Sequence, residues 1–154
     1  MQPVIATEAD VPAWLFLAEQ VEDLFGPLVE DPGFRAALLR NIGRGTALCV
    51  RVDAAASRAA LAGGLLLSAH HPTYQITWLA VSREHRGDGI GELLVRTALD
   101  TMLEPPCAVE VTTFGPDHPG HAARGFYEHL GFEPASAVTA DGARQTYRLQ
   151  VPRS

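Results

Sequence analysis

The stretch His85–Leu94 reads HRGDGIGELL and places three glycines within five residues, directly before an apolar, helix-forming segment. Glycine has no Cβ atom, so it adopts positive φ readily and lets another molecule approach the backbone. A glycine loop that opens a helix leaves several N–H groups without partners, and the helix dipole adds partial positive charge there. The stretch therefore predicts a site for phosphate or diphosphate, with Arg83 and Arg86 beside it.

Other interpretations of the glycine loop can be compared on the sequence. A tight strand-to-helix turn without any ligand explains three glycines equally well. A P-loop ends in Gly-Lys-Ser/Thr, whereas Gly91 is followed by Glu92 and Leu93. A dinucleotide fingerprint requires G-x-G-x-x-G, whereas Gly87, Gly89 and Gly91 are spaced G-x-G-x-G. Both of these other phosphate motifs fit poorly.

Apolar periodicity and turn residues predict a mixed α/β order of elements around this loop. Strands are expected at 3–6, 46–52, 61–70, 73–82 and 107–114 and on both sides of Asp141-Gly142, and helices from a cap at Thr7 or Asp10 to Val21 and at 33–41, 89–103 and 121–130. Gly43 and Gly131 are expected to end two of the helices. Gly63-Gly64 indicates a bulge or the close approach of another backbone. This order predicts one sheet covered by helices.

The helix at 89–103 has the clearest pattern. Polar residues recur every four positions in one stripe, namely Glu92, Arg96, Asp100 and Glu104. Apolar residues fill most of the remaining surface, so the helix is expected to be buried over a wide arc. Glu92 and Arg96 are expected to form an i,i+4 ion pair.

The composition is that of an acidic globular chain. A length of 154 residues suits one domain over residues 1–154. No apolar run reaches the roughly 18 residues needed to cross a bilayer, and the N-terminal segment does not resemble a secretory signal, so we expect a cytoplasmic location and no membrane partner. The net charge of −6 disfavours nucleic acid as a partner and is compatible with a cationic amine.

Cys49 and Cys107 are expected to be buried and reduced, although their positions alone leave a disulfide open.

Two segments resemble the signatures of the GNAT superfamily of N-acetyltransferases. Residues 78–94, WLAVSREHRGDGIGELL, resemble its acetyl-CoA-binding motif Arg/Gln-x-x-Gly-x-Gly/Ala, which Arg86, Gly89 and Gly91 match. Residues 121–132, HAARGFYEHLGF, resemble its second signature, a helix that carries Phe-Tyr-Glu and ends in Gly-Phe. The resemblance implies a mixed α/β, GNAT-like acyl-CoA N-acyltransferase fold. Its sheet would be mostly antiparallel and twisted, with about six or seven strands and about four flanking helices, and splayed between the strands at 73–82 and 107–114.

The resemblance also implies functional roles. In the family, the glycine loop binds the diphosphate of the cosubstrate acetyl-CoA and the preceding strand lies beside its pantetheine arm. The residues that match these positions are Leu79, Ala80, Val81, Arg86, Gly87, Asp88, Gly89, Ile90 and Gly91. Tyr127 matches the catalytic tyrosine, whose phenol can protonate the departing thiolate; a purely structural ring is the alternative. The amine attacks the thioester directly, so neither cysteine is needed as a nucleophile.

Two positions depart from the family pattern. Many members carry an asparagine seven residues before the tyrosine, where this chain has Gly120. Its contact to the pantetheine is therefore either lost or made by another group, for which His118 and His121 are candidates. Many members also carry a glutamate base on the strand before the loop, but the strand at 73–82 has no acidic residue. The general base is therefore open among a water chain, Glu110, Asp117 and His118.

Histidines, aromatic residues and acidic residues give weaker signals. Asp117, His118 and His121 lie close together, but zinc takes three or more ligands at defined spacing, so we expect exposed imidazoles and no metal. In the family the first two helices and the last hairpin wall the acceptor pocket. Aromatic residues in this region either pack in the core, as we expect first, or line that pocket: Trp14, Phe16, Phe25 and Phe34. Acidic residues there either attract an amine or form a solvated face: Glu19, Glu22, Asp23, Glu30 and Asp31.

Three functions follow from these observations. The leading one is an acetyl-CoA-dependent N-acetyltransferase that transfers an acetyl group directly to a primary amine of a small molecule or peptide. The second is a non-catalytic acyl-CoA-binding or sensing module on the same fold, which the two departures favour and Tyr127 disfavours. The third is a nucleotide-binding domain that uses the glycine loop for another phosphate. Dimers are common in the family, so the resemblance is compatible with a homodimer.

Overall fold

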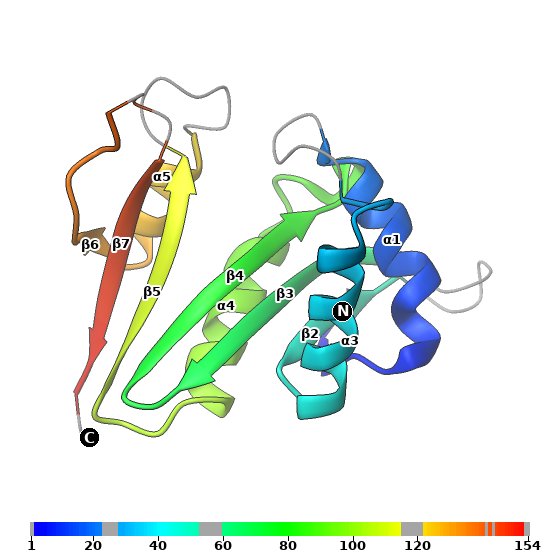
Figure 1. Cartoon of the computed structure of the whole chain (residues 1–154), viewed down its shortest axis with the longest axis horizontal. Helices are drawn as coiled ribbons and strands as arrows, with labels where there is room; N and C mark the ends of the chain where they lie inside the picture. The colour runs from blue at the N-terminus through cyan, green and yellow to red at the C-terminus, as the bar shows by residue number, and fades with distance from the viewer. Residues whose placement is uncertain are drawn as a thin grey trace. The chain divides into compact units, whose positions relative to one another are not determined.

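The glycine-rich stretch connects strand β4 (Thr73–Val81) to helix α4 (Ile90–Thr101) in the computed structural model of the chain. The structure describes residues 2–22, 28–52, 60–114, 122–140, 142 and 144–152. The other elements are β1 (Pro3–Ile5), the short 3-10 helix η1 (Glu8–Asp10), α1 (Val11–Glu19), α3 (Pro32–Arg44), β2 (Ala47–Arg51), β3 (Leu61–His70), the 3-10 helix η3 (Arg83–His85), β5 (Cys107–Phe114), α5 (Ala122–His129), β6 (Glu133–Pro134) and β7 (Arg144–Val151) (Figure 1). This is the predicted mixed α/β order.

Seven strands form a sheet in the order β1-β2-β3-β4-β5-β7-β6. The ladders β1-β2, β2-β3, β5-β7 and β6-β7 are antiparallel, and β4-β5 is parallel. The β4-β5 ladder pairs Thr73–Ile76 with Ala108–Val111, whereas β4 continues to Val81. The mostly antiparallel sheet and the flanking helices confirm the predicted fold class. The resemblance predicts a splay between β4 and β5, and their ladder covers only the first part of β4.

The chain divides into two compact units. The first contains residues 1–67 and 78–102, and the second contains residues 68–77 and 103–154. The single domain expected over residues 1–154 stays a prediction. Among the helices that the structure describes, none combines the length and the hydropathy that crossing a bilayer requires.

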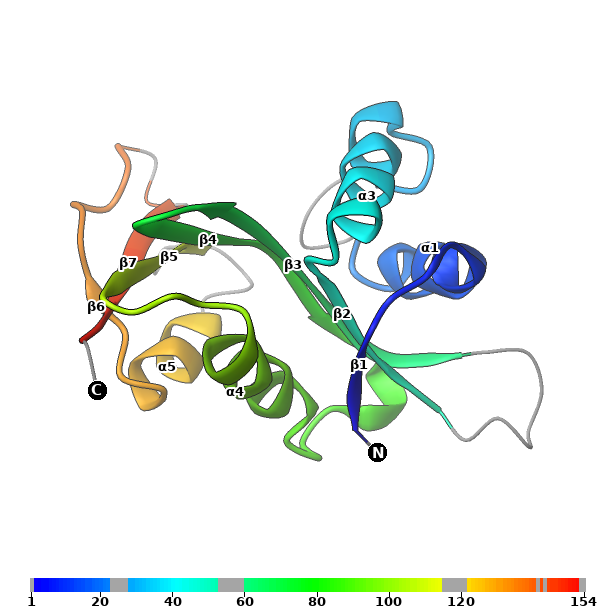
Figure 2. The same ribbon diagram turned by 90° about the horizontal axis from the view of Figure 1, so that it is seen from below.

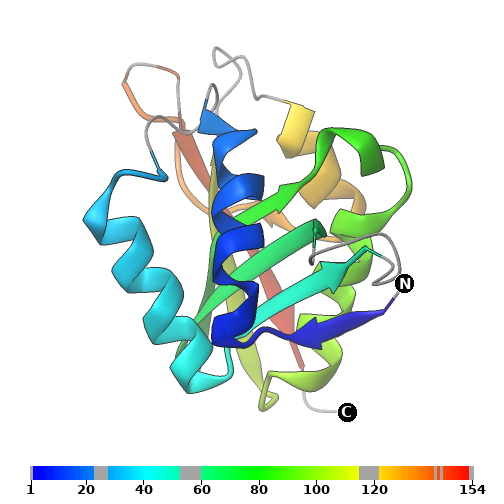
Figure 3. The ribbon, with the colours of Figure 1, turned by 90° about the vertical axis from the view of Figure 1, so that its right-hand side faces the viewer.

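Helices cover both faces of the sheet in the first unit. α1 and α3 lie side by side on one face of β2 and β3, and α4 lies on the other (Figures 2 and 3). Trp14 and Leu17 of α1 and Leu38 of α3 are fully buried, and the Trp14 ring centroid lies 5.7 Å from that of Trp78. Because helices cover both faces, β2 and β3 are buried almost continuously rather than at alternate residues.

The buried and exposed residues of α4 lie where its sequence predicts them. Leu94 and Val95 are fully buried, whereas Arg96 and Asp100 are exposed. The predicted ion pair is present, with 3.0 Å between Arg96 Nε and Glu92 Oε2. The apolar arc of α4 therefore fixes this helix against the sheet, and with it the position of the glycine loop at its start.

Gly63 and Gly64 allow helices to approach β3 closely. A Cβ atom at Gly63 would lie 2.9 Å from Ile90 Cγ2, and one at Gly64 would lie 2.8 Å from the ring of Trp14. The β2-β3 ladder also changes register here, between Val50 and Arg51. The close approach and the irregularity predicted from this pair are both present, although side chains rather than a backbone make the closest contacts.

Two predictions about the first unit are wrong. Helix α3 does not end at Gly43 but continues to Arg44 and ends at Gly45, whose φ of 72° is left-handed. Phe16 is not a core residue, because 65% of it is exposed, whereas Trp14 and Phe34 are buried as expected. Phe25 lies outside the described residues.

The predicted final hairpin is only partly formed. β7 pairs with β5 along its whole length, but β6 contains only Glu133 and Pro134. Proline has no N–H to donate to a ladder, so a strand does not readily extend through it. Beyond Pro134 only isolated bonds to the β7 segment follow, such as Ala135 N to Thr146 O at 2.8 Å. Asp141 lies outside the described residues.

Candidate active site

Gly87 and Gly89 occupy the turn that leads into α4. Their φ angles are 87° and 80°, and Gly89 is the N-cap residue of the helix. Both glycines are exposed, and a Cβ atom at either would meet no described atom within 4 Å. Positive φ rather than crowding therefore requires glycine here, and the space beside the backbone is open to a ligand.

The start of α4 presents backbone N–H groups to this space. The Leu93 N–H donates to the Gly89 carbonyl over 3.0 Å in the first turn. Ile90 and Gly91 come before Leu93 in the chain, in the first turn of the helix. Helix geometry therefore gives their N–H groups no acceptor within α4. The helix dipole places partial positive charge at the same end. This combination suits an anion such as phosphate.

Two arginines flank the turn. The side chain of Arg86 is exposed, and its Nε lies 3.3 Å from the carbonyl oxygen of Val81. Arg83 is held by the end of α1: its N–H donates to Gln20 Oε1 over 2.9 Å and its Nη2 to the Gln20 carbonyl over 3.2 Å. Gln20 is 63 residues away in sequence, and no local motif could have predicted this contact.

The end of β4 leads directly into the turn. Ala80 is buried, and Leu79 and Val81 are half-buried. These residues lie beyond the β4-β5 ladder, which stops at Ile76. The buried Ser82 hydroxyl and His85 Nδ1 are 2.7 Å apart, which closes η3 onto the end of the strand. The structure thus brings together the predicted sites Leu79–Val81 and Arg86–Gly91.

Tyr127 belongs to the second unit, where it lies on α5 among aromatic rings. Only 5% of it is exposed, and its ring centroid is 5.0 Å from that of Phe126 and 5.5 Å from that of Phe132. Burial raises the pKa of Tyr127 well above its usual value. In the described part of the chain its hydroxyl has no hydrogen-bond partner. Gly131, with φ of 97°, ends α5 as predicted.

The second unit also contains a polar cavity of about 270 Å³. Its lining residues come from β4, β5 and β7: Gln75, Ile76, Thr77, Glu110, Thr112 and Thr146. Glu110 was one of the candidate bases, and the structure adds its partner Arg148, whose Nε donates to Glu110 Oε2 over 2.8 Å. The alternation of residues along β5 and β7 indicates which side chains share a face. It does not indicate which residues lie opposite each other, so the sequence alone does not identify this pair.

Several other candidates have structural roles or are outside the described residues. Glu22 Oε2 accepts hydrogen bonds from the N–H groups of Leu28 (2.7 Å) and Val29 (3.0 Å), which lower the pKa of Glu22. Asp31 Oδ1 caps α3 by accepting from Gly33 N. The candidates outside the described residues are Asp23, Asp117, His118, Gly120 and His121. Among the residues that are described, no three histidine, cysteine or acidic side chains gather as metal ligands would.

Both cysteines are free and buried, so the disulfide that the sequence left open is not formed. Burial raises the pKa of Cys49 to about 11. A thiol with a raised pKa is a weak nucleophile at neutral pH, because the thiolate is the reactive form. Burial raises the pKa of Cys107 as well, so neither thiol is activated as a nucleophile.

The comparisons with known proteins agree with this geometry. A family model described as "Acetyltransferase (GNAT) family" matches residues 14–132. No curated protein sequence matches the chain.

Similar solved structures include PaiA N-acetyltransferase from Thermoplasma acidophilum in complex with coenzyme A, with a TM-score of 0.74 and 14% identity over 97% of this chain and 98% of that chain. Ribosomal-protein-alanine N-acetyltransferase from Brucella melitensis has a TM-score of 0.72 and 18% identity over 98% of this chain and 100% of that chain. A chain of the NatC complex bound to Gag peptide and CoA has a TM-score of 0.73 and 20% identity over 98% of this chain and 99% of that chain. Since the family model covers well over half of the chain, including both signature segments, the protein belongs to the GNAT family of acetyltransferases.

Proposed function

We propose that this GNAT-family N-acetyltransferase binds the diphosphate of its cosubstrate acetyl-CoA on Arg86–Gly91 and places the pantetheine arm along Leu79–Val81. The acceptor is the primary amine of a small molecule or peptide. The observation that carries the proposal is the start of α4, where Gly87 and Gly89 combine positive φ with open space beside the backbone. Solved structures of the same fold contain coenzyme A, in one case together with a peptide.

The residues present fit a diphosphate. Backbone N–H groups at a helix start bind anions without a cost in side-chain ordering, and Arg86 supplies a full positive charge beside them. Gly89 cannot be replaced by a larger residue without strain at its φ of 80°. Leu79–Val81 lie beyond the β4-β5 ladder and can therefore offer backbone groups to the amides of a pantetheine arm.

Acetyl-CoA supplies an acetyl group that is activated as a thioester. The lone pair of a neutral acceptor amine forms the new C–N bond while the C–S bond breaks, and the sulfur takes the bonding electrons. The nitrogen gives up one proton and the sulfur gains one, so the products are an amide and a thiol. We assign delivery of a proton to the sulfur to the Tyr127 hydroxyl. A phenol holds its proton at neutral pH at its ordinary pKa of about 10, and burial raises the pKa of Tyr127 further.

Calorimetric titration with acetyl-CoA tests the proposed diphosphate site. Arg86→Gln removes a positive charge from an exposed side chain, and we expect the dissociation constant to rise about tenfold because a charge-assisted hydrogen bond is lost. Arg96→Gln is the matched control, because Arg96 is exposed on α4, the helix that follows the turn, and pairs with Glu92; this variant should bind as the wild type does.

The alternatives give different results in the same experiment. Equal affinities of the two variants would contradict the assignment of the loop. Preferential binding of ATP over coenzyme A would favour a nucleotide-binding domain. Tight binding of acetyl-CoA without acetylation of any amine in a broad panel would favour a sensing module.

A further inference from the structure

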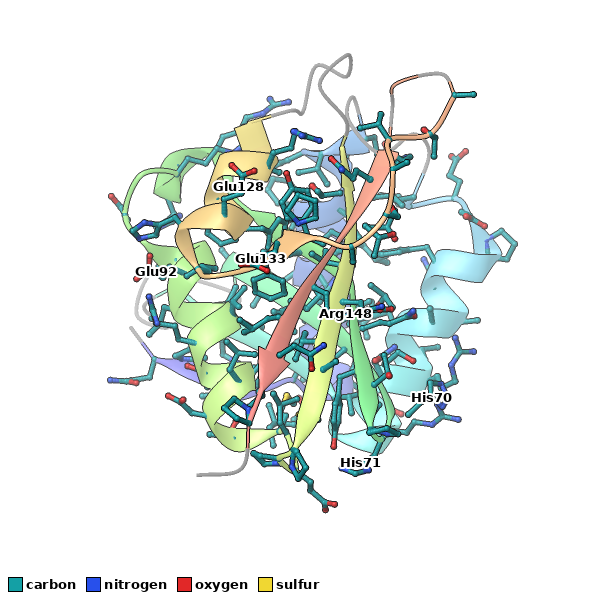
Figure 4. The ribbon with its side chains drawn as sticks, turned by 90° about the vertical axis from the view of Figure 1, so that its left-hand side faces the viewer. His70, His71, Glu92, Glu128, Glu133 and Arg148 are labelled. Carbon is teal, nitrogen blue, oxygen red and sulfur yellow. The ribbon has the colours of Figure 1, made fainter. Side chains whose placement is uncertain are left out.

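One face of β5 and β7 in the second unit is polar. Glu110 and Arg148 are cross-strand partners and therefore point to the same side of the two strands. Val111 and Tyr147, the next pair, point to the opposite side, where the Tyr147 hydroxyl donates to Glu128 of α5 over 2.9 Å. Figure 4 shows α5 against that side, with Glu128 on the helix and Arg148 on β7. Glu110 therefore lies on the face that α5 does not cover.

The cavity of about 270 Å³ opens on this face. Ile76 is the one apolar residue among the described ones that line it, and Gln75, Thr112 and Thr146 supply an amide and two hydroxyl groups. The oxygens of the two threonine hydroxyls are 3.1 Å apart. Pockets for drug-sized ligands span about 300–1,000 Å³ and are mostly apolar. This cavity is smaller and polar, so it suits a small hydrophilic molecule.

Glu110 carries the charge among the described lining residues. Arg148 donates from Nε and from Nη2 to the same oxygen, Oε2, so Oε1 has no hydrogen-bond partner within the described residues. The Glu110 side chain is 18% exposed and that of Arg148 is 44% exposed. The arginine is therefore the more solvated member of the pair, and it restrains the carboxylate while leaving one oxygen available to a cation.

We infer that Glu110 binds the acceptor amine as an ammonium ion, which releases one proton to water before the neutral amine attacks the thioester. The acceptor class is a small hydrophilic amine with a hydroxyl or amide group rather than a peptide with an apolar N-terminal residue. This inference rests on the proposed function and identifies its acceptor. Arg148 is a positioning residue, because it orients the carboxylate and does not line the cavity itself. The net charge of −6 favours the approach of a cationic amine.

Initial rates with matched amines test the acceptor class. Ethanolamine and propylamine have nearly the same size and differ in one hydroxyl group, and glycinamide adds an amide. We expect kcat/KM for ethanolamine and glycinamide to exceed that for propylamine, for phenethylamine and for a peptide beginning Met-Leu by about tenfold or more. An apolar ligand would cover the polar groups of the cavity without pairing with them, which costs binding free energy.

Substitution of Glu110 tests its role. Glu110→Gln keeps the size of the side chain and removes its charge. We expect the KM for ethanolamine to rise about tenfold or more while the KM for acetyl-CoA is unchanged. Glu104→Gln is the matched control, because the exposed Glu104 belongs to the same unit and does not line the cavity, and both of its KM values should equal those of the wild type. Thr112→Val, at an exposed position, should reduce the preference for ethanolamine over propylamine.

Failure of the inference can be distinguished from failure of the proposed function. Preference for the apolar amines or the peptide, or a Glu110→Gln variant that matches the wild type, overturns the inference while acetyl-CoA binding and turnover support the function. Acetyl-CoA binding without acetylation of any hydrophilic amine also overturns it. A wild-type protein that does not bind acetyl-CoA overturns the proposed function and the inference together.

Discussion

At the scale of single residues, Tyr127 carries a proton at neutral pH, so the role proposed for it is that of a donor rather than of a base. Burial between Phe126 and Phe132 raises its pKa further, so the phenolate is not populated. A thiolate that develops beside such a hydroxyl can accept this proton. The other two tyrosines have structural roles. The Tyr147 hydroxyl donates a hydrogen bond to Glu128, and the Tyr74 hydroxyl accepts one from the Glu104 N–H.

We therefore expect Tyr127→Phe to lower kcat by about a hundredfold while the dissociation constant for acetyl-CoA stays the same, since general acid catalysis contributes about 10²–10⁴-fold. Single-turnover rates and calorimetry on the same preparation measure the two quantities. Tyr74→Phe loses a hydroxyl from the same unit and should keep the wild-type kcat. An unchanged kcat in Tyr127→Phe would remove Tyr127 from the mechanism.

The sequence predicts residue roles that depend on local spacing, such as those of Arg86 and Gly89, and misses partners that are distant along the chain. Asp10 was expected only as a helix cap. Arg51, 41 residues away, donates from Nε to one of its carboxylate oxygens (3.0 Å) and from Nη2 to the other (2.8 Å). Burial raises the pKa of Asp10, but hydrogen bonds from Arg51 and Thr7 outweigh this effect and lower it. Nothing near Asp10 in sequence indicates this pair.

At the scale of elements, the sequence predicts which segments form helices and strands and in what order. The residue at which each element ends depends on the backbone conformation there, which tertiary contacts help to determine. The sequence pattern predicted that α3 ends at Gly43. The structure places the left-handed residue at Gly45, and Thr46, which follows, accepts from the N–H of Leu67 in β3. The pairing with a later strand thus decides where the helix stops.

This difference predicts opposite effects of one substitution at two neighbouring positions. Gly43→Ala should raise the free energy of unfolding by about 0.5–1 kcal/mol, because Gly43 lies within α3 and a Cβ atom there has open space. Gly45→Ala should lower it by about 1 kcal/mol or more, because φ is 72° there. Urea denaturation measures both, and changes of the same sign would contradict the assigned end of α3.

At the scale of the whole molecule, the two signature segments and the order of elements between them are visible in the sequence and match the family model. The splay between the strands at 73–82 and 107–114 was expected only from the family resemblance, and the residues at which the β4-β5 ladder stops, Ile76 and Val111, were not predicted. The polar cavity of the second unit was not predicted, because its residues come from three strands whose register the sequence does not specify. The cytoplasmic location and the homodimer stay predictions.

The central claim is that backbone N–H groups at the start of α4 bind the diphosphate of acetyl-CoA. A crystal structure of the protein with bound coenzyme A tests it most directly. We predict diphosphate oxygens within hydrogen-bond distance of the N–H groups of Gly89, Ile90 and Gly91, with the Arg86 side chain beside them. Coenzyme A bound elsewhere, with no phosphate at the start of α4, would contradict the account.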